Sequence, residues 1–208
     1  MTPDAVAALF TRPDGAYQFA RWGRPIVPVV FGVDDATLST FKGAIEAVVT
    51  LAGHKMAEAD VELGANLMFF FFRDWAELLL VPGLHAIVPE LDRLCPRLEA
   101  QGANQYRLFR FDPEGTIRAA FVFLRFDDAL ASVPALDLAL AQAAQVMCIW
   151  SEQAFRNQPP LIKAGQTVVL RPEIAAVIRA AYDHLMPPMA SDASHALRIF
   201  ARMNLRTH

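Results

Sequence analysis

The run GANLMFFFF, residues 64–72, limits the fold of this chain more than any other stretch. A strand with one wet face alternates apolar and polar residues, whereas this run is continuously apolar after its first residues. Gly64 opens the run and Arg73-Asp74 follow it, so the apolar residues between them have the length of one strand. The four consecutive phenylalanines fit a protein core better than a ligand cage. We therefore expect a central strand that is covered on both faces of its sheet.

The segment before this strand predicts a second strand and a helix. RPIVPVVFG, residues 24–32, is rich in β-branched residues, and its two prolines suit the start or edge of a strand. Asp34 or Asp35 can cap the helix that follows. Apolar residues then recur at helical spacing from Leu38 to Ala52, until Gly53 stops them. We expect an amphipathic helix lying on the sheet.

The middle of the chain carries the clearest local signal, a β-hairpin. Residues 106–111 and 117–126 read as two strands, and DPEG between them, residues 112–115, places proline and glycine as a turn prefers. Before the hairpin, residues 75–81 and 86–98 read as short helices separated by Pro82-Gly83. These residues predict a compact helical connection followed by two antiparallel strands.

A long helix is predicted next, from Pro134 to Phe155. Its apolar or small residues lie three or four apart: Leu136, Leu140, Ala144, Met147, Ser151 and Phe155. Residues 167–170 suggest a brief strand, Pro172 starts a helix that stops before Pro187, and Ser191 or Asp192 caps a last helix to about Leu205. We predict an α+β fold with a mixed sheet in one domain, residues 1–208, with a helical C-terminal portion, residues 157–208.

The composition limits the classes of function. The chain has 208 residues, of which 54% are hydrophobic and 20% charged, so a disordered chain is excluded. The apolar excess indicates a thick core, a surface that meets a peptide or protein partner, or both; an oligomer interface is a third alternative. A formal charge of −3 gives no reason to expect nucleic acid. No run is apolar enough to span a membrane, and no signal peptide is visible, so we expect a cytoplasmic chain; an exported protein whose signal had been removed would read the same.

Metal and redox chemistry find little support in the sequence. Cys95 and Cys148 are the only cysteines, and buried free thiols are favoured over a disulfide. No two of the five histidines lie three or four residues apart, so a zinc site would have to assemble across the fold. We predict no metal and no cofactor.

The segment CIWSEQAF, residues 148–155, is the best candidate for a site. On the predicted helix Ser151 and Phe155 would share a face, with Glu152 about 100° around the axis. Zinc peptidases use H-E-x-x-H on a helix because two imidazoles four apart grip the metal, while the glutamate activates its water. Here the glutamate is kept and both imidazoles are lost. The plainer alternatives are an ion pair of Glu152 with Arg156, and Ser151 as a small packing residue.

The element order and this segment together resemble a zincin, the fold of the metallopeptidases. More specifically, the chain resembles an uncharacterised bacterial family, some members of which are labelled as lipoproteins. The family marker is matched by Cys148, Glu152 and the pair Tyr182-Asp183, and also by the EGTIRAAFVFL and RWGRPIVPVVFG segments. Departures are Ser151 in place of a first Glu, Phe155 in place of a Gln, and Arg156-Asn157 in place of a Gly-Leu segment.

The resemblance implies a zincin-like domain that has lost its metal and acts as a binding or structural module rather than an enzyme. Zincins hold peptides along a sheet edge by main-chain hydrogen bonds. The edge would come from the hairpin, Tyr106 to Arg125, and the floor of the cleft from Ser151 and Phe155. Tyr182 and Asp183 are further candidate binding residues. The alternative is a metal-dependent hydrolase with Glu152 as general base and His184 or Asp183 as metal ligands.

Overall fold

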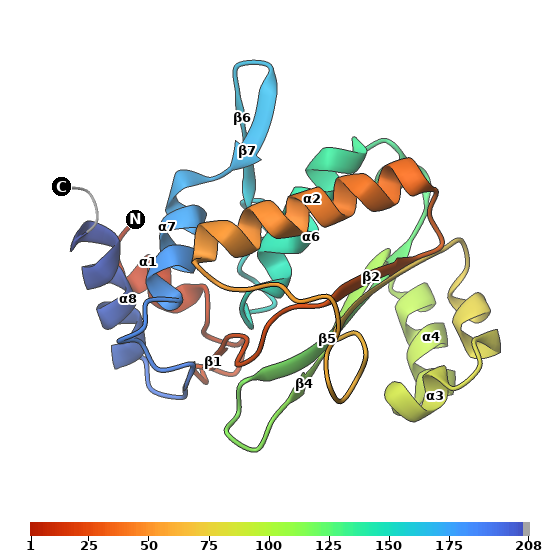
Figure 1. Cartoon of the computed structure of the whole chain (residues 1–208), viewed down its shortest axis with the longest axis horizontal. Coiled ribbons are helices and arrows are strands. Elements are labelled where there is room, and N and C mark those ends of the chain that lie inside the picture. Colours follow the sequence, from red (N-terminus) through yellow and green to blue (C-terminus); the bar gives the residue numbers. More distant parts are fainter. Residues whose placement is uncertain (206–208) are drawn as a thin grey trace.

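A four-stranded mixed sheet in the order β2-β3-β5-β4 forms the framework of the structure, a computed structural model that describes residues 1–205 (Figure 1). Its strands are β2 (Pro28–Phe31), β3 (Leu67–Phe72), β4 (Gln105–Phe111) and β5 (Ile117–Arg125). β2, β3 and β5 run parallel, whereas β4 pairs antiparallel with β5. The predicted central strand and hairpin are confirmed. Because β5 also pairs with β3, only β4 of the predicted hairpin edge is an edge strand.

Helices cover both faces of this sheet, as the apolar run of β3 predicts (Figure 1). α2 (Asp35–Ala52) and α6 (Ala135–Val146) lie on one face, and the 3₁₀ helix η1 (Trp75–Leu80), α3 (Leu84–Ile87) and α4 (Leu91–Ala100) lie on the other. α2 begins where the Asp34 carboxylate accepts a hydrogen bond from the Thr37 N–H, and it ends at Gly53, whose φ is +68°. Both predicted helix boundaries are confirmed.

The C-terminal portion packs against the amino-terminal helix and the end of α2. It contains α7 (Pro172–Ala181) and α8 (Ser194–Leu205), and α8 contacts α1 (Pro3–Ala8). A two-stranded hairpin of β6 and β7 projects away from the body of the molecule (Figure 1). The remaining short elements are β1 (Phe19–Ala20), α5 (Asp128–Ala131), β6 (Leu161–Ala164), β7 (Thr167–Leu170) and β8 (Met189–Ala190).

The predicted long helix from Pro134 to Phe155 is wrong in its second half, because α6 ends at Val146. Three side chains take the carbonyls that would continue it. Trp150 Nε1 donates to the Ala144 carbonyl, Trp22 Nε1 to the Val146 carbonyl, and the Tyr182 hydroxyl to the Met147 carbonyl. The candidate segment 148–155 therefore leaves the helix axis before Ser151 and Glu152, and their predicted placement on a helix face is also wrong.

The backbone N–H groups of the same segment find partners in the amino-terminal region. The Ile149 N–H donates to the Ala20 carbonyl at 2.9 Å, and the Ser151 N–H donates to the Leu9 carbonyl at 2.7 Å. Cys148 forms an isolated antiparallel bridge with Arg21. These bonds replace helical ones with contacts to residues more than a hundred positions earlier, so the helical spacing of the sequence is overridden by tertiary structure.

Candidate functional site

A groove of about 640 Å³ runs between the edge strand β4 and the segment that follows α6. The strand side is lined by residues 105–109 and Phe111, and the opposite side by residues 149–152, Phe155 and Arg156. Arg12 of the amino-terminal loop and Gln145 of α6 complete the lining. The groove therefore brings together the predicted sheet edge and three of the predicted site residues, Ser151, Glu152 and Phe155.

The outer edge of β4 is open to a further strand. The Arg125 N–H donates to the Asn104 carbonyl, and the β4–β5 register is unbroken from Gln105 to Arg110, which fixes the alternation of the ladder over these residues. The backbone groups of Gln105, Arg107 and Phe109 consequently point away from β5. Within residues 1–205, no other element hydrogen-bonds to these outward groups. β4 thus presents unpaired donors and acceptors along the groove.

The two faces of β4 are chemically different. Gln105, Arg107 and Phe109 lie on the face of α6, where both polar side chains contact Gln142 and Phe109 packs against the core. Tyr106 and Leu108 pack against the core beneath η1 and α4. A strand added to this edge would place alternate side chains on the α6 face, beside the groove wall.

Aromatic packing fixes the wall opposite β4. Trp150 stacks on the buried Phe10 with ring centroids 5.2 Å apart, and it meets Phe155 edge to face at 5.1 Å. Ser151 is buried, and its hydroxyl accepts a hydrogen bond from the Gln153 N–H at 3.3 Å. No base lies within hydrogen-bond distance of this hydroxyl among the described residues, so Ser151 acts in local turn geometry.

Glu152 is exposed at the groove, and the structure forms no ion pair between it and Arg156. It is the only carboxylate among the lining residues, which include no histidine and no cysteine. Zinc requires three or four nitrogen, sulfur or oxygen ligands that converge on one point. In residues 1–205 no three His, Cys, Asp or Glu side chains are grouped in this way. The residues at Glu152 do not fit a zinc ion.

Tyr182 and Asp183 do not join this site. The Tyr182 hydroxyl donates to the Met147 carbonyl at 2.6 Å, and the Arg21 guanidinium lies over its ring, 5.1 Å from the centroid. Asp183 pairs with Arg202 of α8 at 3.1 Å and also lies 3.5 Å from His184. The pair matched to the family marker therefore supports the end of α6 and the position of α8, and neither residue lines the groove.

No family model, no curated protein and no solved structure matches the chain. Of the described residues, no helix combines the length and apolar character needed to cross a membrane. The zincin-like resemblance thus rests on the residues quoted from the sequence.

Arg107, which lines the groove, and Gln142, which it contacts, have no counterpart among the sequence candidates. Arg107 sits in the strand YRLFRF, and Gln142 lies on α6 opposite it. Arginine within a largely apolar hairpin strand is a signal that could have pointed to Arg107, although Arg110 of the same strand gives the same signal. Only the packing of α6 against the sheet shows which helix residue it meets.

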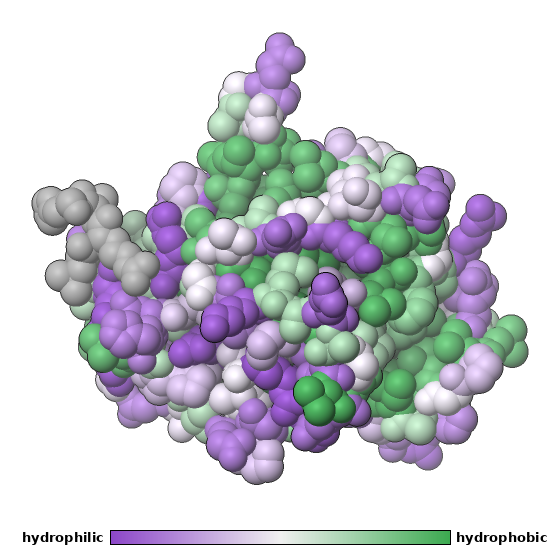
Figure 2. All heavy atoms as spheres, in the orientation of Figure 1, coloured by the Kyte–Doolittle hydropathy of each residue, from purple (hydrophilic) through white to green (hydrophobic). Residues whose placement is uncertain are grey.

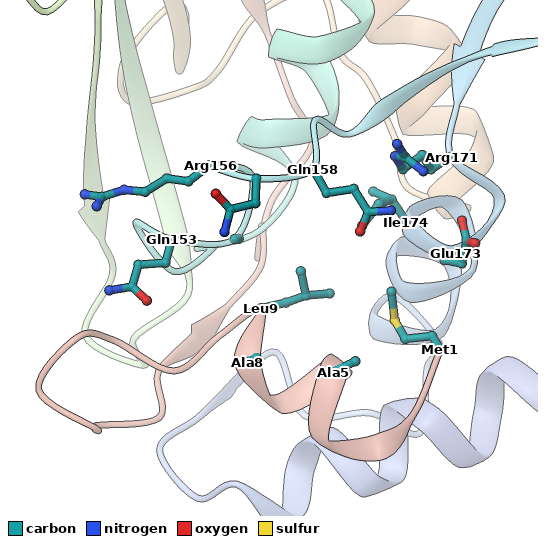
Figure 3. Close-up of a pocket in the computed structure, with 12 residues that line it drawn as sticks. Met1, Ala5, Ala8, Leu9, Gln153, Arg156, Gln158, Arg171, Glu173 and Ile174 are labelled. Atoms are coloured by element: carbon teal, nitrogen blue, oxygen red, sulfur yellow. The ribbon is translucent and has the colours of Figure 1, made fainter.

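A neighbouring hollow of about 750 Å³ shares Arg156 with the groove (Figure 3). It lies between α1, the loop after residue 152 and the start of α7, and its lining includes Leu9, Gln158 and Ile174. In Figure 3 the Arg156 side chain extends away from Met1 and Ile174, toward the strands. Arg156 therefore contributes its charge to the groove at β4.

A third surface is apolar rather than cationic. Figure 2 shows hydrophobic residues gathered between the first half of α2 and the helices α3 and α4. A hollow of about 430 Å³ lies in this region and is lined by Phe31, Phe70, Leu78 and Ile87 among others. Phe31 is 47% exposed and stacks on Phe70 with centroids 5.1 Å apart. No candidate residue of the sequence lies there.

Proposed function

We propose that this protein is a non-catalytic, zincin-like binding module that takes up an extended peptide segment along the outer edge of β4. The observation that carries the proposal is the row of outward backbone groups at Gln105, Arg107 and Phe109, which border a groove instead of a covering element. Strand addition to such an edge obtains its affinity from main-chain hydrogen bonds and its selectivity from pockets for alternate side chains.

Zincins hold peptides along the edge of a sheet, and the sheet of this protein also has an edge strand beside a cleft, which supports the zincin-like part of the proposal. The edge strand is antiparallel to its neighbour and borders a cleft whose other wall is the segment after α6. Trp150 and Phe155 give this wall a fixed aromatic surface, so little ordering of the protein is needed when a peptide binds.

A proline substitution tests the main-chain part of the proposal. Phe109→Pro removes one outward N–H and no hydrogen bond of the β4–β5 ladder, and proline is tolerated on edge strands with this orientation. Phe109→Ala is the matched control because it loses the same aromatic ring and keeps the N–H. We expect a phage-displayed library of random eight-residue peptides to yield binders for the Ala variant and far fewer for the Pro variant.

Hydrogen exchange supplies the second readout. Selected peptides should slow exchange of the amides of residues 105, 107 and 109, whereas the amides of residues 106 and 108 are already bonded to β5. Binders that protect amides elsewhere, or equal binding by the Pro and Ala variants, would refute strand addition at β4.

A metal-dependent hydrolase is the alternative: Glu152 is exposed at the same groove, but the metal ligands would have to come from outside the groove lining. It predicts stoichiometric zinc in protein purified without chelator, together with peptidase activity that is lost in Glu152→Gln. The binding module predicts that Glu152→Gln leaves peptide capture at β4 intact. Metal analysis and a peptidase assay on the parent and the variant separate the two.

A further inference from the structure

Arg107 carries a charge at the groove that no carboxylate of residues 1–205 neutralises. Its Nη2 donates to the side-chain carbonyl oxygens of Gln142 at 2.6 Å and Gln105 at 3.0 Å. Its Nε is buried and has no hydrogen-bond acceptor among the described residues. Both partners are neutral amides, so they satisfy donors of the guanidinium without balancing its charge.

The surroundings of Arg107 make an anion favourable at this place. Burial lowers the pKa of Arg107 to about 10, which leaves the side chain charged at neutral pH. A desolvated guanidinium is stabilised by a carboxylate, and the planar fork of its N–H groups matches a carboxylate in two parallel hydrogen bonds. Within the described part of the chain, Arg107 has no such partner, and it lines a groove that is accessible to one.

The other charged residues that line the groove are mostly positive, like Arg107. Arg12 and Arg156 line it together with Arg107, while Glu152 is the single acidic lining residue. The side chains of Arg12 and Arg156 form no ion pair with the described residues. An acidic peptide would therefore meet a net positive groove, which also speeds its encounter with the site.

The register of strand addition decides which peptide side chain faces Arg107. In an added strand, the residue directly opposite Arg107 places its side chain on the same sheet face, about 5 Å from the Arg107 side chain at Cβ. Two residues along, the next side chain on this face lies opposite Phe109, whose ring packs against the core. An acidic residue and an apolar residue at alternate positions fit this face.

We propose that the β4 groove selects extended peptides carrying an aspartate or glutamate opposite Arg107, with an apolar side chain two residues away opposite Phe109. This inference rests on the proposed function and names the class of peptide that it binds. The selectivity comes from Arg107, with Gln105 and Gln142 holding its guanidinium in place.

The test uses the full chain and the same phage-displayed library of random eight-residue peptides. Arg107→Met removes the charge at nearly constant length, and we expect it to fold because it relieves a buried, unbalanced charge. Arg110→Met is the matched control: Arg110 lies on the same strand, but its side chain bonds to the Ile87 carbonyl on the opposite face. Thermal unfolding of each variant confirms that it is folded.

We expect the parent and Arg110→Met to enrich peptides with Asp or Glu at one fixed position, followed two residues later by an apolar residue. Synthetic peptides with Glu→Gln at that position should bind the parent about ten-fold more weakly. Arg107→Met should bind the Glu and Gln forms equally. A parent without acidic enrichment, or an acidic preference that persists in Arg107→Met, would overturn the role of Arg107.

The failure of this inference can be told apart from the failure of the proposed function. If neutral and acidic peptides bind equally and protect the amides of residues 105, 107 and 109, strand addition stands and only the selectivity is wrong. If no peptide protects these amides, both are wrong.

Discussion

The Tyr17 hydroxyl lies 2.8 Å from Nδ1 of His195, so a contact between two buried side chains ties the amino-terminal segment to α8. His195 is only 3% exposed. Its pKa is lowered to about 4, mainly by burial and to a smaller extent by the positive charges of Arg198 and Arg21. His54, which is also in a partly buried place near Arg21, has its pKa lowered by burial as well. Both histidines are therefore neutral in the folded protein at neutral pH.

This relationship predicts that the protein loses stability in mild acid. The unfolded chain binds a proton at His195 with a pKa near 6.5, whereas the folded chain does so only near 4. The stabilisation is complete above pH 6.5 and is lost as the pH falls from 6.5 to 4, by about 3 kcal/mol for this one residue. Urea unfolding at a series of pH values measures it.

The His195→Gln variant should lose much of this pH dependence, because its amide does not titrate. His85→Gln is the control, since His85 is an exposed histidine on α3, and it should follow the parent curve. The idea fails if the parent and His195→Gln lose the same free energy of unfolding between pH 6.5 and 4.

Gly32→Ala should destabilise the protein strongly. Gly32 follows β2 with φ of +81°, and a Cβ at this position would clash with the Phe71 carbonyl oxygen. We expect a loss of more than about 2 kcal/mol, from the left-handed backbone and the backbone contact together. Gly165→Ala has the same sign of φ but open space around it, so it should cost only about 1 kcal/mol. Equal losses in urea unfolding would contradict the steric argument.

Tyr182→Phe should weaken the end of α6. The hydroxyl donates to the Met147 carbonyl at 2.6 Å and accepts from the backbone N–H of Trp22 at 3.4 Å. Its removal leaves a buried carbonyl unpaired, at a cost of about 1–3 kcal/mol in the free energy of unfolding. Tyr106→Phe is the matched control, because the Tyr106 hydroxyl bonds to none of the described residues. A chemical denaturation series in which both variants match the parent would show that the Tyr182 hydroxyl contributes nothing.

Cys148 should react with thiol reagents only after unfolding. Its side chain is fully buried, and burial raises the pKa of its thiol despite the nearby Arg21 charge. The thiolate is the reactive form, so the raised pKa slows the reaction, and burial of the sulfur slows it further by keeping the reagent out. In a Cys95→Ala background, labelling of the native protein should follow the unfolding rate. Rapid labelling without denaturant would mean that the segment after α6 opens locally.

The sequence by itself determined the local elements of this protein. Asp34 and Gly53 delimit α2, the DPEG turn closes the β4–β5 hairpin, and the continuous apolar run of β3 requires cover on both faces. Each of these signals acts over a few residues through a side-chain cap, a turn conformation or the burial of neighbouring side chains. For this reason an α+β chain with a mixed sheet could be predicted without coordinates.

Only the tertiary structure decided where α6 ends and what the candidate segment becomes. The apolar spacing continues to Phe155, yet Trp22 and Tyr182 bind the carbonyls of Val146 and Met147 from distant parts of the chain. In the same way Arg107 meets Gln142 only because α6 packs against the sheet, and Tyr182 lies outside the groove that Ser151 lines. Hydrogen bonds between residues so far apart in sequence leave no local periodicity. For this reason the sequence could predict a cleft between the hairpin edge and Ser151 and Phe155, but not the end of α6 or the contact of Arg107 with Gln142.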